Sequence, residues 1–200
     1  MDAGTFFTIM LGAAIVNNYV LYRFLGLCPL IGVTKDVRNA AAMSFAVIFV
    51  MLKGTAVTWP IHHFLLVPND LGFLRIVAFI IVIGSLVQFV EIALKRYNPP
   101  LYKSFGIYLP LMTTNCAIIA VTLINVAEGF GFLESMTNAL GAGLGFLLAM
   151  VLFAGIRRST ETAEPPASFK GIPLAFVSAA ILSLAFFGFA GVIENIFGYY

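Results

Sequence analysis

Two cysteines are the residues with the clearest capacity for chemistry in this sequence. Cys28 is followed directly by Pro29, and Cys116 comes directly after a Thr-Thr-Asn run at 113–115. Proline is favoured at the first position of a helix, which predicts Cys28 at a helix N-cap, and Thr and Asn are capping types, which predicts Cys116 in a first turn. A helix N-terminus carries partial positive charge and favours the thiolate form. Both sulfurs would therefore suit metal ligation.

Other roles for the two thiols are also compatible with the pattern. Free cysteine packs as a small apolar residue, and proline and glycine are common in membrane helices. A disulfide is disfavoured because both cysteines are predicted within or near the membrane, away from outer loops where oxidation occurs. A thiolate-bound zinc or iron-sulfur site needs four ligands, so a metal here would require two from another chain. His62 and His63 are adjacent, and consecutive helical positions do not face one ligand.

The composition places these cysteines in a membrane protein. The chain has 200 residues, of which 61% are hydrophobic and 10% charged, and its mean hydropathy is +1.02. An ordinary soluble domain is about one quarter charged. The net charge of +2 leaves no basic surface for nucleic acid, and two cysteines are too few for a disulfide scaffold.

Six apolar stretches are long enough to cross a hydrocarbon layer of about 30 Å. They cover residues 5–24, 39–58, 71–94, 101–125, 132–156 and 172–196. The first is a true span rather than a signal peptide, because no basic segment precedes it and its apolar run is too long.

The distribution of Lys and Arg predicts the orientation of these spans. Nine of the 11 cations flank the first, third and fifth connections: Arg23, Lys35, Arg38, Lys95, Arg96, Lys103, Arg157, Arg158 and Lys170. Short cytoplasmic loops collect such cations. We therefore predict cytoplasmic loops at about 25–39, 95–103 and 157–171, with both termini on the outer side.

The spans group as three plus three, which predicts a single membrane domain over 1–200 with halves at about 1–97 and 98–200. Because each half has an odd number of spans, the second half enters the membrane in the opposite direction, as an inverted repeat. A shift of 98 residues does not superpose the two cysteines. Span one contains Gly and Asn and is followed by Gly26 and Pro29, and span four contains Pro, Gly and Asn. Both are predicted to be broken helices, which membranes tolerate only inside protein or beside a cavity.

The remaining chain lacks phosphate loops, dinucleotide fingerprints, hydrolase triads and zinc-protease motifs. A small secondary carrier is one alternative function, in which Asn17, Asn18, Thr114 and Asn115 would bind a solute and the cysteines would be incidental. A purely structural membrane protein without iron is another.

The irregular segments resemble a known family. Val-Asn-Asn-Tyr-Val-Leu at 16–21, Phe-Leu-Gly-Leu-Cys-Pro at 24–29 and Leu-Pro-Leu-Met-Thr-Thr-Asn-Cys-Ala at 109–117 are similar to the RnfA/NqrE family of membrane subunits. The similarity extends through 87–91, 98–102 and the last span. The doubled asparagine and the Cys-Pro pair resemble the RnfA branch, from the Rnf complex, more than the NqrE branch, from sodium-pumping NADH:quinone reductase.

This resemblance implies a specific fold, cofactor and set of partners. Members are all-α integral membrane proteins with six spans in two inverted halves, located in the prokaryotic cell (inner) membrane. They pair with a homologous RnfE-like subunit, and two cysteines from each hold one 2Fe-2S cluster; the ligands carried over to this chain are Cys28 and Cys116. The complex, which also contains subunits of B, C, D and G types, transfers electrons from ferredoxin to NAD or another acceptor and translocates Na⁺ or H⁺. The chain would thus be part of a translocase-class enzyme, with no complete active site of its own. A cluster near mid-membrane would divide a layer of about 30 Å into two shorter electron steps.

Overall fold

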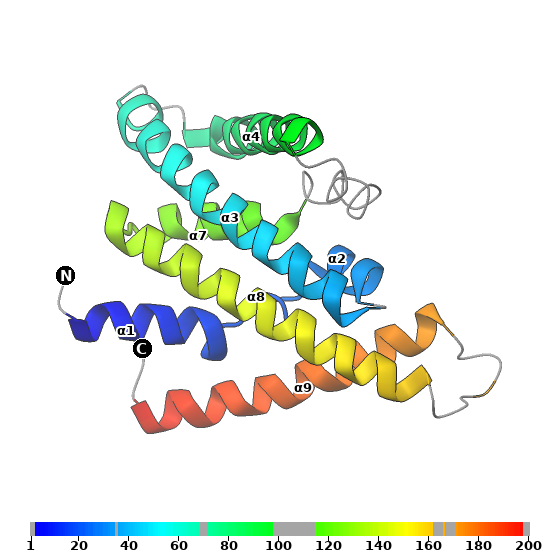
Figure 1. Cartoon of the computed structure of the whole chain (residues 1–200). Helices are drawn as coiled ribbons and strands as arrows, with labels where there is room; N and C mark the ends of the chain where they lie inside the picture. Colours follow the sequence, from blue (N-terminus) through cyan, green and yellow to red (C-terminus); the bar gives the residue numbers. More distant parts are fainter. Residues whose placement is uncertain are drawn as a thin grey trace.

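A computed structural model describes residues 3–34, 36–68, 72–97, 115–161, 166 and 171–197, which are helical apart from short connections (Figure 1). The predicted all-α class is confirmed for this part of the chain. The helices in order are α1 (Ala3–Leu11), η1 (Gly12–Val16), α2 (Leu27–Val33), α3 (Val37–Ile61), η2 (His62–Leu66), η3 (Gly72–Leu74), α4 (Arg75–Tyr97), α7 (Cys116–Ala127), α8 (Phe132–Glu161) and α9 (Ile172–Phe197).

Three helices are long and apolar enough to cross a membrane. They cover Val37–Leu66, Gly72–Phe89 and Phe132–Thr160, and shorter apolar helices cover Phe6–Val16, Cys116–Ala127 and Ile172–Gly188. The second, third and fifth predicted spans are thereby confirmed as membrane-length helices. The part of the fourth predicted span at 101–114 lies outside the described residues.

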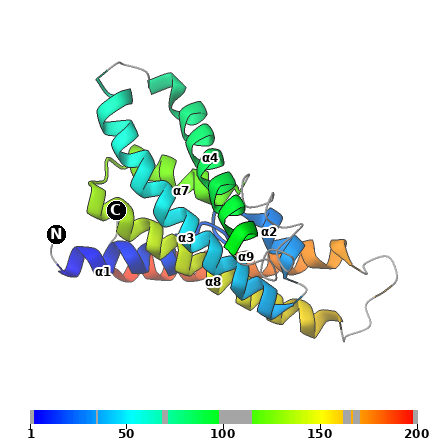
Figure 2. The same cartoon turned by 45° about the horizontal axis from the view of Figure 1, so that its top comes forward.

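The antiparallel pair α3 and α8 forms the centre of the molecule (Figure 2). Trp59 near the end of α3 packs edge-to-face on Phe132 at the start of α8, and a Cβ on Gly143 would lie 2.8 Å from Ile48 Cγ1. Glycine therefore lets the two helices approach closely, as small residues do between membrane helices.

The first helix lies against a second glycine face of α8. A Cβ on Gly141 would come within 2.6 Å of the Met10 carbonyl oxygen, and one on Gly145 within 2.8 Å of the Ala14 oxygen. The backbone of α1 and η1 is therefore in direct contact with that of α8, with no room for side chains between them.

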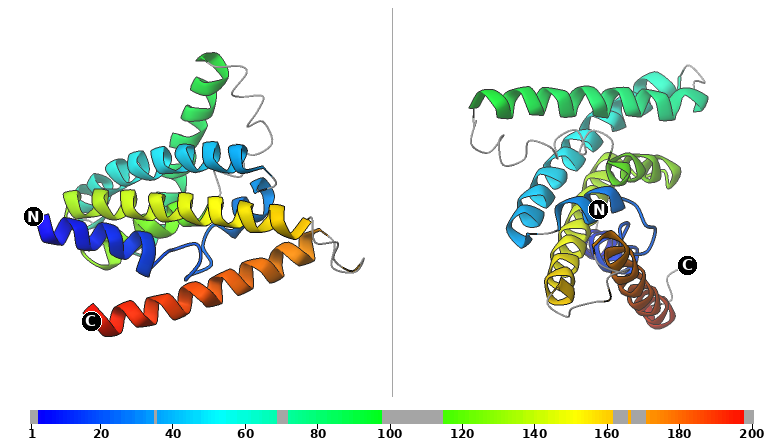
Figure 3. Two further views of the ribbon diagram at one scale, coloured as in Figure 1. Left: turned by 60° about the horizontal axis from the view of Figure 1, so that its bottom comes forward. Right: turned by 90° about the vertical axis from the view of Figure 1, so that its right-hand side faces the viewer.

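The last helix, α9, packs beside the non-helical stretch that follows η1. The Ser183 hydroxyl donates a hydrogen bond to the Leu21 carbonyl, and the ring of Phe187 stacks on Tyr22 at 5.0 Å between centroids. The start of α1 and the end of α9 lie at the same end of the molecule (Figures 1 and 3).

Two of the predicted loop boundaries were wrong. The expected loop at 25–39 contains the helix α2, Leu27–Val33, and the expected loop at 157–171 begins only after Glu161, where α8 ends. In both places tertiary contacts extend helix into a segment that composition marked as a connection. At the third connection α4 continues to Tyr97, and residues 98–103 lie outside the described part.

Candidate metal centre

The predicted break in the first span is confirmed, and one side chain satisfies much of its backbone. After η1 the chain is non-helical until Gly26. Asn18 is only 1% exposed; its Nδ2 donates to the Ala14 oxygen at 3.1 Å and the Gly145 oxygen at 2.9 Å. Its Oδ1 accepts from the Val20 and Leu21 amides at 3.0 and 3.3 Å. Broken backbone at membrane depth needs such partners.

These four hydrogen bonds use both amide protons and both acceptor positions of Asn18. A solute could bind this side chain only by displacing them. The carrier hypothesis therefore loses one of its four proposed ligands, and Thr114, another of them, lies outside the described residues.

The break ends at a direct link between the two cysteine segments. Gly26 is the N-cap of α2 and has left-handed backbone, with φ of 86°. Its N–H donates a hydrogen bond to the Sγ atom of Cys116 at 2.9 Å. Residues 90 positions apart are thus joined at one sulfur.

The helix start at Cys116 follows the prediction. Asn115 is the N-cap of α7, its Oδ1 accepts from the Ala117 amide at 3.0 Å, and Cys116 is the first helical residue. The thiol is free and half-buried. Its position follows from local capping chemistry, which the sequence carries.

Cys28 lies near a helix start but not at the predicted N-cap. It is the second residue of α2, Pro29 is the third, and Gly26 takes the cap. The correction has a physical reason: the left-handed turn at Gly26 begins the helix two residues early and directs its N–H to Cys116. The Cys28 thiol is free and exposed.

The starts of α2 and α7 each pack against the midpoint of a long neighbouring helix. A Cβ on Gly26 would lie 3.1 Å from Cε2 of Phe146, which is halfway along α8. Ile118, two residues after Cys116, approaches the Cβ position of Gly54 to 3.9 Å, and Gly54 lies near the middle of the span Val37–Leu66. The segment that carries the cysteines is therefore inside the helical layer rather than at its edge.

The family model described as "Rnf-Nqr subunit, membrane protein" matches residues 6–193. The chain belongs to the Rnf-Nqr family. It is 53% identical to the A-type subunit of the ion-translocating oxidoreductase complex of Azoarcus sp. (strain BH72), over 94% of this chain and 97% of the relative. It is 47% identical to the A-type subunit of the Na⁺-translocating ferredoxin:NAD⁺ oxidoreductase complex of Acetobacterium woodii, over 94% and 98%.

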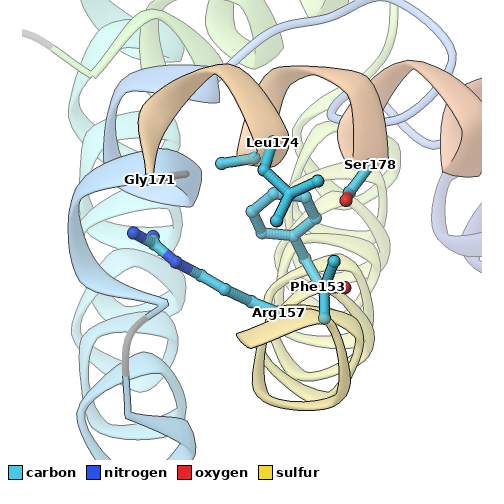
Figure 4. A pocket seen from close by; sticks show the side chains of 7 residues that line it. Phe153, Arg157, Gly171, Leu174 and Ser178 are labelled. Carbon is cyan, nitrogen blue, oxygen red and sulfur yellow. The ribbon is translucent and has the colours of Figure 1, made fainter. Parts of the chain in front are cut away.

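The other end of α2 in this Rnf-Nqr protein is held by a residue that was predicted to lie in a loop. Arg157 is 9% exposed, and its Nη1 donates to the Ile31 carbonyl at 2.7 Å and to the Thr34 hydroxyl at 3.4 Å. Its side chain extends from α8 toward α2 along a cavity of about 60 Å³ whose rim includes Gly171 (Figure 4). The last carbonyls of a helix have no partner within the helix and need donors from elsewhere. This general requirement was the only feature of the sequence that could have indicated a donor at the end of α2.

The donor set of this Rnf-Nqr protein fits one half of a thiolate site. Thiolates select iron-sulfur clusters and zinc over hard cations such as Na⁺ or Mg²⁺. Among the described residues no three His, Cys, Asp or Glu side chains come close enough to hold a metal together. The exposed Cys28 and the half-buried Cys116 are both free thiols, the soft donors that such a site requires.

Replacing Gly26 by alanine tests the link between the two segments. Left-handed backbone costs a residue with a Cβ about 1–2 kcal/mol, and this Cβ would also meet Ala117 Cβ at 3.2 Å. We expect Gly26→Ala to lower the thermal stability of the purified protein, measured as a lower melting temperature.

The matched control is Gly129→Ala. Gly129 also has positive φ, 66°, but nothing lies within 4 Å of its Cβ position, so it incurs the backbone cost alone. Equal losses in the two variants would show that contacts around Gly26 place no constraint on the cysteine segments.

Proposed function

We propose that this chain is the A-type subunit of an Rnf-type ion-translocating electron-transport complex. In this role it relays electrons across the bilayer through a 2Fe-2S cluster shared with a homologous RnfE-like subunit. The observation that carries the proposal is the Gly26 N–H···Sγ bond to Cys116, which joins two cysteine-bearing helix starts midway along the long helices. The names of the relatives, an ion-translocating and a Na⁺-translocating ferredoxin:NAD⁺ oxidoreductase, support it.

Cys28 and Cys116 would each supply one thiolate to the cluster, and the homologous subunit would supply the other two. When bound, such a cluster supplies a one-electron carrier. The Gly26 N–H donates to Cys116 Sγ and stabilises negative charge on that sulfur. Asn18 holds the preceding loop against α8, and the apolar side chain of Phe146 limits water beside Gly26.

The proposed membrane arrangement is six spans in two inverted halves, with both termini on the outer side of a prokaryotic cell membrane. The order and directions of the helices support it: α2, α3 and α4 alternate in direction, and α7, α8 and α9 repeat the alternation with opposite sense (Figure 1). Each series begins with a short helix that has a cysteine among its first two residues. The two cysteines are thus near-equivalent in this arrangement, although the shift of 98 residues between the two halves does not superpose them.

Iron analysis of the chain alone and within its complex tests the proposal. We expect the complex purified from its native membrane to contain the intramembrane 2Fe-2S signal, and the chain expressed alone to fold without retaining iron. An isolated chain that binds the full cluster would contradict a shared site. A complex free of intramembrane iron would favour a structural role, and solute uptake by liposomes containing only this chain would favour a carrier.

A further inference from the structure

Asn115 contains a buried hydrogen-bond donor that has no acceptor in the described part of the chain. The residue is 2% exposed, and its Nδ2 atom has no partner among the described residues. An unpaired buried amide costs about 1–3 kcal/mol. Such a cost calls for an acceptor that the described part of the chain does not contain.

The orientation of this amide is set by the cap of α7. Its Oδ1 accepts the Ala117 N–H at 3.0 Å. If the O and N atoms of this amide were exchanged, the NH₂ group would face the Ala117 N–H, with one donor against another. The oxygen must therefore accept from Ala117, and the NH₂ group is the one without a partner among the described residues. The unpaired donor is therefore a consequence of capping rather than of the assignment of N and O.

The surroundings of Asn115 combine sulfur and apolar groups. The next residue is Cys116, whose Sγ accepts from Gly26, and the Cβ position of Gly26 lies 3.5 Å from Asn115 Oδ1. The other atoms near the same position are carbons, Cε2 of Phe146 and Cβ of Ala117. Among the described residues, the neighbouring group that could gain an acceptor for this NH₂ is the thiol of Cys116, once it holds a metal centre.

We propose that Asn115 Nδ2 donates a hydrogen bond to a sulfur of the metal centre held by Cys116 and Cys28, and that this bond raises the reduction potential of the centre. The inference rests on the proposed function. Reduction adds negative charge to the sulfurs, and hydrogen bonds to sulfur stabilise that charge, so potentials depend on them. The Gly26 N–H is a first such donor and Asn115 is a second.

The test is a redox titration of the intramembrane iron-sulfur signal in the intact complex. Asn115→Ser and Asn115→Asp both retain an N-cap oxygen, because Asn, Asp and Ser cap about equally well, but both lose the NH₂ group. Asn125→Ser is the control: Asn125 is buried on the same helix, but its Nδ2 donates to the Ser135 carbonyl, remote from the cysteines. We expect Asn115→Ser to make reduction about tenfold less favourable, about 59 mV for one electron, with no shift in the control. Asn115→Asp also adds a negative charge beside the centre, so its potential should fall further.

A second readout is the magnetic coupling of the reduced centre to exchangeable protons, which should lose one strongly coupled proton in the Asn115 variants. An unchanged potential in Asn115→Ser, or an equal shift in Asn125→Ser, would overturn the inference. Loss of iron from both variants would also overturn it, since the amide would then hold the centre rather than tune it. The proposed function fails separately, if the signal survives in Cys28→Ala and Cys116→Ala.

Discussion

We expect Cys28→Ala and Cys116→Ala each to abolish the intramembrane iron-sulfur signal of the complex and its ferredoxin-driven electron transfer. Each substitution would remove one of the four thiolates of the proposed shared cluster, and alanine offers no ligand in its place. Cys28→Ala should change the free energy of unfolding of the chain only slightly, because the Cys28 side chain is exposed and contributes little to packing. Iron content, the spectroscopic signal and turnover of the purified complex measure the result.

Serine at the same positions separates ligation from packing. Cys→Ser nearly preserves the size of the side chain but replaces a soft thiolate with a poor ligand for iron. If the thiols serve only as small apolar groups, iron and turnover will persist in both the Ala and Ser variants. That result would contradict the assignment of Cys28 and Cys116 as ligands.

Replacing Gly141 by alanine should produce a large loss of stability, because its Cβ would make the closest contact among the described glycines. The new Cβ would lie 2.6 Å from the Met10 carbonyl oxygen and 3.1 Å from Met10 Cα, so backbone, not a flexible side chain, would have to move. Overpacking typically costs about 1–3 kcal/mol, occasionally more. We expect Gly141→Ala to lower the free energy of unfolding by about 3 kcal/mol or more. The loss would be measured as a lower melting temperature by circular dichroism in detergent.

Gly155→Ala on the same helix provides the control. Nothing lies within 4 Å of its Cβ position, so the substitution should gain the helical preference of alanine over glycine, about 1 kcal/mol. The two variants have the same composition and should shift the melting temperature in opposite directions. Similar shifts would show that α1 does not pack on the Gly141 face.

Some of this site could be predicted because its causes are local in sequence. Asn115 caps α7 through the amide of Ala117, only two residues away, so the placement of Cys116 in a first turn needed no knowledge of the fold. The placement of Cys28 at an N-cap, inferred from Pro29 alone, was wrong because the cap at Gly26 depends on a sulfur acceptor 90 residues away. Arg157 was assigned to a loop because its partners, Ile31 and Thr34, are also distant in the sequence.

The sequence by itself determined that the chain is an apolar, all-helical membrane protein of the Rnf-Nqr family with a break in its first span and two thiols beside helix starts. Hydropathy, helix capping and proline sterics act over a few residues, and the sequence contains them in full. Only the tertiary structure decided that Gly26 donates to Cys116 and that Asn18 donates to the Gly145 carbonyl. It also decided that the Asn115 NH₂ group has no acceptor among the described residues. These depend on helices packing at glycine contacts between segments about 90 to 130 residues apart. Which backbone atoms meet there is set by the fit of whole helix surfaces, which no short stretch of sequence specifies.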